Sequence, residues 1–450
     1  MAASAAGAWE SKGTSAPIVC QRGGPDSEKQ LEAAQDPTVN DPPNGGYGWI
    51  MVISILLLNA ATWGFNTSFG VYLSYFEAND TFSGATPLKY SLVGSSSIAV
   101  ALLCAPLANF LTKHFGHRVP MLAGALSCSL GQCMAGLCKN FETYIVCQGL
   151  IFGVGLGLTL VPSQPLLAQW FDRRLSLAQG LANAGSGFGG LIFSNTTRLL
   201  IERTSVKYSL IANGTISAGI LFPCILLMKP RLKESGAFSE PLQLSWIVHR
   251  GFVWVWIWGG LAMMSYYVAL YSIAIFATNG LGLSQAQGAM IQSLLAAGLM
   301  IGRPIAGFVL DKFGRVNMAI ALCLANGIAC WAVWLPSRSI ASLAAFALIQ
   351  GGAGGAVWSA AAPVAASTVG VKNLGSAMAV FWLSLIVPCF AGNPLAMLLQ
   401  EYSRSNLGKS GAGAYAISIG FCGALSAAAG FCLYGTKWYL QGHAKLFYKV

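Results

Sequence analysis

One arginine, Arg303, lies inside the apolar run LLAAGLMIGRPIAGFVLDKFG, residues 294–314, which is long enough to form a membrane-spanning helix. A guanidinium at mid-membrane depth costs about 2.5 to 3.5 kcal/mol on insertion scales, so such residues usually have a function. The chemistry it offers is recognition of a carboxylate or another polar, anionic group. Pro304 adds an acceptor, because it removes one helix hydrogen bond and frees the carbonyl of Met300.

Arg303 has no acidic partner within the apolar runs. All 15 Asp and Glu fall in the N-terminal region, in loops or at the ends of the runs, and the four histidines, at positions 114, 117, 249 and 443, also fall outside the runs. Proton relays usually need a titratable group inside the membrane. We therefore expect facilitated movement of a solute, or coupling through a group near a helix end.

Three roles are open to Arg303, which lies eight residues before Asp311, about 12 Å along a helix. It could face inward and bind a substrate, pair with backbone carbonyls, or snorkel to the membrane surface. The first role is favoured, because an arginine side chain reaches only part of that distance. Weaker candidates for the same site, each equally compatible with packing or an interfacial belt, are Trp63, Asn66, Thr67, Tyr267, Tyr271, Trp358 and Trp382.

The elements that must position these residues are membrane helices. The 450 residues are 55% hydrophobic and only 9% charged, against roughly 25% charged in a soluble domain. Windows of about 20 apolar residues suffice to cross a bilayer as helices. Twelve such windows predict an all-α membrane protein, with spans at 49–73, 91–112, 119–138, 143–168, 176–200, 209–228, 251–278, 286–310, 317–335, 340–364, 373–398 and 413–435.

The twelve spans fall into two similar halves. The segment KHFGHR (113–118) follows the second span, and DKFGR (311–315) follows the eighth, at equivalent places in the two halves. Such a duplication is typical of transporters whose substrate site lies near the bilayer midplane between the halves. The predicted parts are a disordered cytoplasmic tail (1–48), an N-terminal six-helix half (49–228), a cytoplasmic linker (229–250), a C-terminal six-helix half (251–435) and a cytoplasmic tail (436–450).

The net charge of +11 follows from topology rather than from nucleic-acid binding. With the N-terminus in the cytoplasm, 17 of the 26 Lys and Arg lie on the cytoplasmic side and eight on the other, Arg303 being the remaining one. This positive-inside bias predicts that both termini are cytoplasmic. The expected partners are a small-molecule substrate and the lipid bilayer, without nucleic acid; an accessory membrane subunit is left open. The plasma membrane is the expected location, with the vacuole second.

The remaining sequence features are weaker. Residues 1–48 are polar and rich in Pro, Gly and Ser, so no cleavable signal peptide is expected there. The 12 cysteines are scattered singly and are interpreted as small core residues, and neither a metal nor a cofactor is expected. Asn79 begins the sequon Asn79-Asp80-Thr81 in the first non-cytoplasmic loop and is a candidate glycosylation site.

The eighth span ends in a recognisable motif. Gly307-x3-Asp311-Lys312-x-Gly314-Arg315 resembles the loop motif of the major facilitator superfamily. The resemblance implies that this charged turn, with close helix packing at its glycine, helps to hold the cytoplasmic gate through Gly307, Asp311 and Arg315. The first copy is degraded, with Lys113 where the acid would stand. The alternative is a solvated basic turn that only fixes topology.

Two further stretches resemble the monocarboxylate transporter family. They are PPNGGYGWIMV at the first span, similar to the fungal branch, and WFDRRLSLAQGLANAGSGFGG (170–190) before and within the fifth, with IGRP (301–304) and GNPLA (392–396) in register. The small residues of the fifth span form a surface that lets helices approach closely and slide. Arg173 and Arg174 are gating candidates at a face where positive charge is expected anyway.

The departures from that family carry as much information as the matches. The family's opening motif begins with an acid, where this chain has Asn44. Proton-linked members carry a lysine at the position of Thr67, and an aspartate at the position of Leu299, one helical turn before Arg303 and on the same face. Only Arg303 remains of this charged constellation, so the family's proton-lactate mechanism is not expected.

The leading hypothesis is a secondary transporter that moves a small organic solute, a carboxylate or a metabolite, by alternating access. The alternative is an exporter of a fungal secondary metabolite, which a neighbouring biosynthetic gene cluster would support. A transporter-like receptor is a remote third hypothesis. Such proteins often carry long cytoplasmic extensions, whereas the tails expected here, 1–48 and 436–450, are short. An enzyme is not expected, since the apolar runs hold no cluster of His, Asp, Glu or Cys that could do chemistry.

Overall fold

The computed structural model describes residues 42–79, 82, 87–231, 243 and 245–441. Within these residues the chain is helical and contains no strand. Most of the predicted N-terminal tail, Asp80 and Thr81 of the sequon, most of the linker between the halves and the last nine residues lie outside the described part.

The first half contains six spans, several of them built from two or three consecutive helical segments. They are α2 (Gly48–Asn59) with η2 (Ala60–Gly64) and α3 (Phe65–Asn79); α4 (Pro87–Leu103) with α5 (Ala105–Phe115); α6 (Arg118–Ala135); α7 (Phe141–Tyr144) with η3 (Ile145–Ile151) and α8 (Phe152–Ala168); α9 (Leu175–Arg203); and α10 (Val206–Leu227).

The second half begins after the short helix α11 (Ser245–Val248) and repeats this arrangement. Its segments are α12 (Phe252–Ile275) with η5 (Phe276–Gly280); α13 (Gln285–Phe313); α14 (Arg315–Ala329) with η6 (Cys330–Trp334); α15 (Ile340–Gly352) with η7 (Gly354–Ala356) and the start of α16 (Val357–Ser384); the rest of α16 with α17 (Ile386–Ser405); and η8 (Gly411–Tyr415) with α18 (Ala416–Gln441). Gly370 breaks α16 with a φ of 75°, which separates the tenth span from the eleventh.

The twelve-helix, two-half prediction is confirmed. Nine helices of the described residues are long and apolar enough to span a membrane, and ten if the pair Leu92–Leu103 and Ala105–Phe115, bent by 42°, counts as one span. The other two predicted spans, α6 and α9, are interrupted by Gly, Ser, Gln and Asn, which lower their hydropathy. Both pack against neighbouring helices, α6 against α8 and α10, and α9 against α2 and α13.

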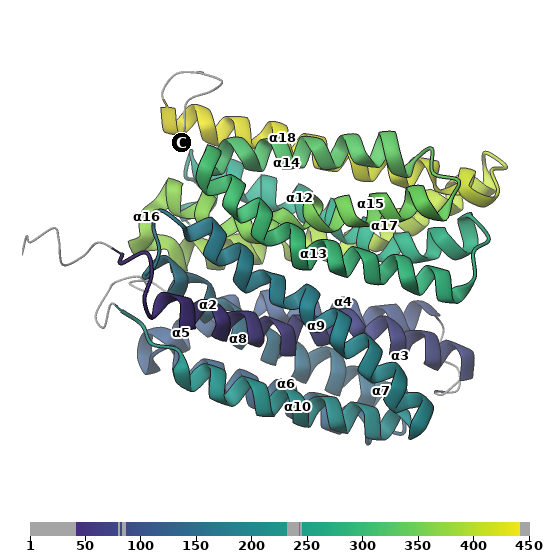
Figure 1. The fold of residues 1–450 in the computed structure, drawn as a ribbon, viewed down its shortest axis with the longest axis horizontal. Helices are drawn as coiled ribbons and strands as arrows, with labels where there is room; N and C mark the ends of the chain where they lie inside the picture. Colours follow the sequence, from purple (N-terminus) through teal and green to yellow (C-terminus); the bar gives the residue numbers. More distant parts are fainter. Residues whose placement is uncertain (1–41, 80–81, 83–86, 232–242, 244, 442–450) are drawn as a thin grey trace, which may run out of the picture. The chain divides into compact units, whose positions relative to one another are not determined.

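The helix α9 belongs to the first half and lies at its interface with the second. Figure 1 shows the helices of the first half, purple to teal, on one side and those of the second half, green to yellow, on the other, with α9 and α13 meeting between them. Within its own half, α9 contacts α2 and η2 so closely that a Cβ at Gly185 would overlap the carbonyl of Leu56, and one at Gly189 that of Ala60. The small-residue pattern predicts this close approach.

The small residues of α9 also let it pack closely against α13 of the second half. A Cβ at Gly187 would lie 2.7 Å from the backbone nitrogen of Met300, and one at Gly180 would overlap the carbonyl of Arg303. The helix α13 begins at a capping box, in which Ser284 accepts from the amide of Gln287 while the side chain of Gln287 accepts from the amide of Ser284, 3.0 Å away. The seam between α9 and α13 therefore sets the position of Arg303.

Candidate functional site

Arg303 is buried in the middle of α13, with 3% of the residue exposed. Its Nη1 donates to the carbonyl oxygen of Asn183 at 2.6 Å and to the hydroxyl of Ser186. Both acceptors are on α9, in the opposite half, and both are neutral. The guanidinium is thus bound to the other half of the protein through uncharged oxygens, and its burial excludes the snorkelling alternative.

Neighbouring residues fit this arrangement. Leu299 is 1% exposed, and a Cβ on Gly355 would meet both its side chain, at 2.5 Å, and Nε of Arg303, at 3.4 Å. Positions 299 and 303 therefore share a face, as their spacing predicts, and an apolar residue occupies the place of the family's aspartate. The carbonyl that pairs with Arg303 belongs to Asn183 rather than to Met300, the one that Pro304 frees. Nε of Arg303 has no hydrogen-bond partner.

Three of the predicted tryptophans gather beside Arg303. Its Cζ lies 5.9 Å from the ring of Trp358. The Trp358 ring contacts Trp63, with ring centroids 5.4 Å apart, and stacks on Trp382 at 5.5 Å. Trp63 comes from η2 in the first half, and the other two come from α16 in the second. This tryptophan cluster, Trp63, Trp358 and Trp382, therefore bridges the two halves next to the cation.

Tyrosines of α12 complete the surroundings. Tyr267 interacts electrostatically with Arg303, and its ring stacks on Tyr271 with centroids 6.0 Å apart. Tyr266, which is not among the predicted site residues, lies within hydrogen-bonding reach of the guanidinium. A pair of adjacent tyrosines does not reveal which ring faces the site, since that depends on the rotation of the helix about its axis.

Two predicted residues lie elsewhere. Asn66 accepts a hydrogen bond from Ser97 on α4, with 3.2 Å between the oxygens. Thr67 donates to the carbonyl of Gly64 at 2.7 Å and lies against Gly190 of α9. Both contacts stay within the first half, so the structure does not bring these two residues to Arg303.

Asn183 and Ser186 belong to the site but are missing from the sequence-based candidates. Besides accepting from Arg303, Asn183 donates from its amide nitrogen to the carbonyl of Trp358 at 2.9 Å, again across the halves. Their spacing of three residues places both on one face of α9. Two polar side chains at that spacing in a helix of small residues are the signal that could have found them.

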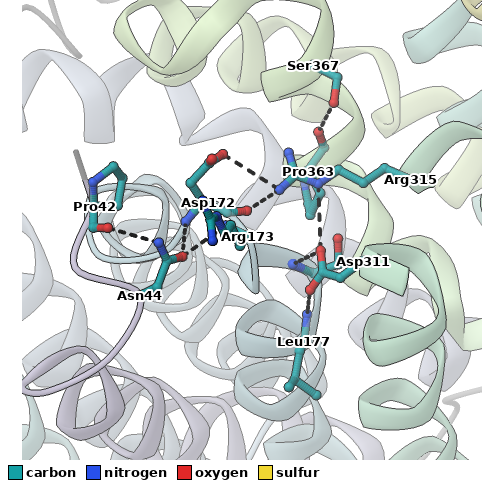
Figure 2. A network of polar contacts seen from close by, with 10 residues as sticks. Pro42, Asn44, Asp172, Arg173, Leu177, Asp311, Arg315, Pro363 and Ser367 are labelled. Atoms are coloured by element: carbon teal, nitrogen blue, oxygen red, sulfur yellow. Dashed lines mark hydrogen bonds and ion pairs between the residues drawn. The ribbon is translucent and has the colours of Figure 1, made fainter. Parts of the chain in front are cut away.

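A second polar connection between the halves lies where α9 begins and α13 ends. The Asp311 carboxylate accepts from the backbone amide of Ser176 at 3.1 Å through Oδ1, and from that of Leu177 at 2.8 Å through Oδ2. Amides in the first turn of a helix lack intrahelical partners, and the helix dipole favours negative charge there. An acid of the second half thus caps a helix of the first (Figure 2).

Arg315, the first residue of α14, extends this connection. Its Nε lies 3.7 Å from Oδ1 of Asp311, and its Nη2 lies 3.9 Å from Oδ1 of Asp172 and donates to the Asp172 carbonyl. Asp172 is not among the predicted gating residues. The ion pairs are long, so the hydrogen bonds to backbone groups are the stronger part of the connection.

Asn44 holds the turn that precedes α9. Its Oδ1 accepts from the backbone amides of Asp172 and Arg173, both at 2.9 Å, and its side-chain nitrogen donates to the carbonyl of Pro42 at 2.9 Å (Figure 2). Its backbone amide donates to the carbonyl of Trp170 at 3.0 Å. Its φ is 53°, a left-handed conformation that Asn and Asp tolerate best among non-glycine residues. The acid found in the family could accept the same two hydrogen bonds, so Asn44 preserves the contact.

The other predicted gating residues take different places. The side chains of Arg173 and Arg174 are exposed, and Arg173 joins the network through its backbone amide. Gly307 packs against the first turn of α9, where an added Cβ would lie 2.9 Å from the Cα of Leu177. Together, Asn44, Asp172, Asp311 and Arg315 form a set of polar contacts, here called the Asp311 network.

The predicted glycosylation site is only partly described. Asn79 is the last residue of α3, while its side chain and the following Asp80 and Thr81 lie outside the described residues. Among the described residues, no group of three or more His, Cys, Asp or Glu side chains is arranged to hold a metal ion.

Comparison with known proteins identifies the family that the chain resembles. A family model described as Major Facilitator Superfamily matches residues 48–392 and 255–437. The chain is 31% identical over 349 residues to the probable transporter MCH2 of Saccharomyces cerevisiae, covering 76% of this chain and 73% of that protein. It is 25% identical over 360 residues to the agnestins efflux protein AgnL12 of Paecilomyces divaricatus, covering 77% and 79%. The proton:xylose symporter XylE has a similar fold, with a TM-score of 0.66 at 13% identity over 86% of this chain and 95% of that one.

Proposed function

The chain belongs to the major facilitator superfamily, and from that premise we propose that this secondary transporter carries a small organic carboxylate or acidic metabolite, which it binds at Arg303. One observation carries the proposal: the guanidinium is buried between the halves on two neutral acceptors of α9. Both acceptors are neutral, whereas a carboxylate adds the attraction of a second charge and can accept two parallel hydrogen bonds from the guanidinium. A carboxylate that reaches Arg303 can therefore displace Asn183 and Ser186.

That exchange links binding to movement. When the substrate takes the guanidinium, the bonds between α13 and α9 at this depth are lost. The Asp311 network then remains as the polar connection at the end of the same two helices. We propose that it closes the cytoplasmic side, that both termini are cytoplasmic, and that the halves rock apart there once the network breaks. The monocarboxylate transporter-like subfamily and the plasma membrane fit the same proposal.

Coupling to protons is not part of the proposed transport mechanism. The two acceptors of Arg303 do not titrate in the physiological range, and Leu299 replaces the acid that would. We propose facilitated transport of the anion. Export of a fungal secondary metabolite is a second candidate, supported by the similarity to AgnL12, which is named as an efflux protein.

The experiment compares cells with and without the gene by untargeted measurement of metabolites inside and outside. The compound that changes is then supplied to proteoliposomes that hold the wild type or Arg303→Ala, with a pH indicator inside. We expect uptake by the wild type, none by the variant, and no stoichiometric proton influx. Near-normal transport by Arg303→Ala would overturn the role of Arg303, and proton influx would overturn uncoupled transport.

A further inference from the structure

Resting on the proposed function, we propose that the site selects a planar, conjugated acid that carries carbonyl or phenolate oxygens besides its carboxylate, over a small aliphatic acid. The tryptophan cluster beside Arg303 carries this inference. It concerns which acid is bound, and it adds to the role of the guanidinium described above.

The indole nitrogens of the cluster are buried without partners. Trp63, Trp358 and Trp382 are 7%, 8% and 1% exposed, and Nε1 of each has no hydrogen-bond partner. Nε of Arg303 is buried and unpartnered as well. A buried donor without an acceptor costs free energy, so four of them in one contacting group indicate that acceptors arrive from outside the chain.

The unpartnered groups of the site are all hydrogen-bond donors. An indole nitrogen and a guanidinium can donate hydrogen bonds but cannot accept them. Two nearby backbone carbonyls already accept from other groups, that of Trp358 from Asn183 and that of Arg303 from Ser359 at 3.3 Å. The complementary ligand is therefore rich in acceptor oxygens. A carboxylate can satisfy Arg303, but the indoles need further oxygens.

The shape of the cluster favours a flat ligand. Trp63 of the first half contacts Trp358 of the second, with the ring planes 55° apart, so the contact must part when the halves separate. A conjugated ring that enters between them replaces one aromatic contact by another. An aliphatic acid would leave both the ring faces and the indole donors without partners.

The position of Trp63 is fixed by its backbone. It lies in the π-helical turn η2, and π-helical turns are frequent at functional sites. A Cβ on the following residue, Gly64, would lie 2.6 Å from the Cα of Gly189 on α9. The close approach of the two backbones therefore holds this turn, and with it the indole, against the neighbouring helix.

The test uses the purified full-length protein and three acids: anthraquinone-2-carboxylate, which is flat and has quinone oxygens; 2-naphthoate, which is flat without them; and cyclohexanecarboxylate. We expect affinities to fall in this order, by about tenfold at each step, in calorimetric titrations. Trp63→Phe and Trp358→Phe keep an aromatic ring and remove the donor, so each should lower the preference for the anthraquinone over the naphthoate. The matched control is Trp331→Phe, because Nε1 of Trp331 already donates to the carbonyl of Gly420.

The wild-type titrations decide the inference even if a variant fails to fold. Equal affinity for all three acids, with binding lost in Arg303→Ala, would overturn the inference and leave the proposed function standing. An unchanged preference in both folded Phe variants would also overturn it. If the wild type binds none of the three acids, the inference fails, whereas unaltered binding in Arg303→Ala counts against the proposed function.

Discussion

Nη1 of Arg303 lies 2.6 Å from the carbonyl oxygen of Asn183, so a cation of one half is bound to the backbone of the other. The bond answers the question that the sequence raises about a missing counter-charge: no carboxylate is needed while the halves are closed. The energetic cost of burying a guanidinium is reduced by its donation to two oxygens. The same bond can be given up to a substrate that offers a better acceptor.

Introducing the aspartate that the monocarboxylate transporters, which the chain resembles, carry at position 299 should make transport sensitive to pH. In Leu299→Asp the new carboxylate lies one turn from Arg303 on the same face and neutralises it, so anion transport falls at neutral pH. Lowering the pH protonates the aspartate and frees the guanidinium, so the rate should rise, by up to about tenfold per pH unit for a single titrating group. Initial rates in proteoliposomes across pH 5 to 8 measure this, with Leu299→Asn as the control that cannot titrate. A flat profile for Leu299→Asp would contradict it.

Removing the cap of α9 should open the end of the seam between the halves. In Asp311→Ala the amides of Ser176 and Leu177 lose both acceptor oxygens. Loss of a helix cap typically costs about 1 kcal/mol, enough to raise the open population about fivefold. Maleimide labelling of Ser176→Cys, corrected for the parent protein, reports this exposure.

A matched control for Asp311→Ala is Glu202→Ala, which removes an exposed carboxylate near the other end of α9, where it pairs with Arg198 at 3.5 Å. Exposed pairs of this kind contribute little. Labelling should therefore stay at the parent rate in this variant. Equal rates in both variants would show that Asp311 does not hold the seam closed.

Substitutions at Asn44 should separate its side chain from its backbone conformation. Asn44→Asp keeps an acceptor for the amides of Asp172 and Arg173 but loses the donation to the carbonyl of Pro42, so it should lower the melting temperature least. Asn44→Gly keeps the left-handed backbone but loses the acceptor, whereas Asn44→Ala loses both and adds about 1 kcal/mol of backbone strain. Thermal melting in detergent should rank the variants Asp, Gly, Ala. An Ala variant as stable as the Asp variant would contradict this role.

A methyl group at the seam should impair transport. Gly180→Ala places a Cβ against the carbonyl of Arg303, so α9 and α13 must separate slightly and the bond to Asn183 weakens. We expect a lower melting temperature and at least about a tenfold loss of transport. Gly219→Ala is the control, since nothing lies within 4 Å of its added Cβ. Gly→Ala by itself favours a helix, so similar losses in both variants would mean that the contact between α9 and α13 is not responsible.

The sequence predicts the twelve spans well, because an apolar run of sufficient length is a property of a single helix and needs no knowledge of its neighbours. Arg303 is predictable for the same reason, since a charged residue inside an apolar run is recognisable without knowledge of its neighbours. The weaker spans α6 and α9 are predictable only from their place in the repeat, because their polar and small residues are stabilised by contacts between helices.

The spacing of Asn183 and Ser186 marks them as candidates, but their pairing with Arg303 was not predictable. It depends on how α9 is aligned along α13. These two helices are far apart in the sequence, and their alignment is fixed only when they pack together. The rotation of α12 decides that Tyr266 as well as Tyr267 is close, and Asn66 and Thr67 face α4 and α9 instead. The loss of an acid at Asn44 predicts an altered opening motif, yet the amide oxygen makes the contacts that a carboxylate could make.

The bonds of Arg303 and of Asp311 join the same two helices, and eight residues of α13, about 12 Å, separate them. Both bonds therefore oppose the same separation of α9 from α13. Without a bound substrate, both must break before the halves can move apart. A bound acid removes the first bond only for as long as it stays bound. The empty transporter therefore changes sides more slowly than the loaded one, and its return limits net transport. An inhibitor that occupied the guanidinium without fitting between Trp63 and Trp358 would hold the protein between its two open states.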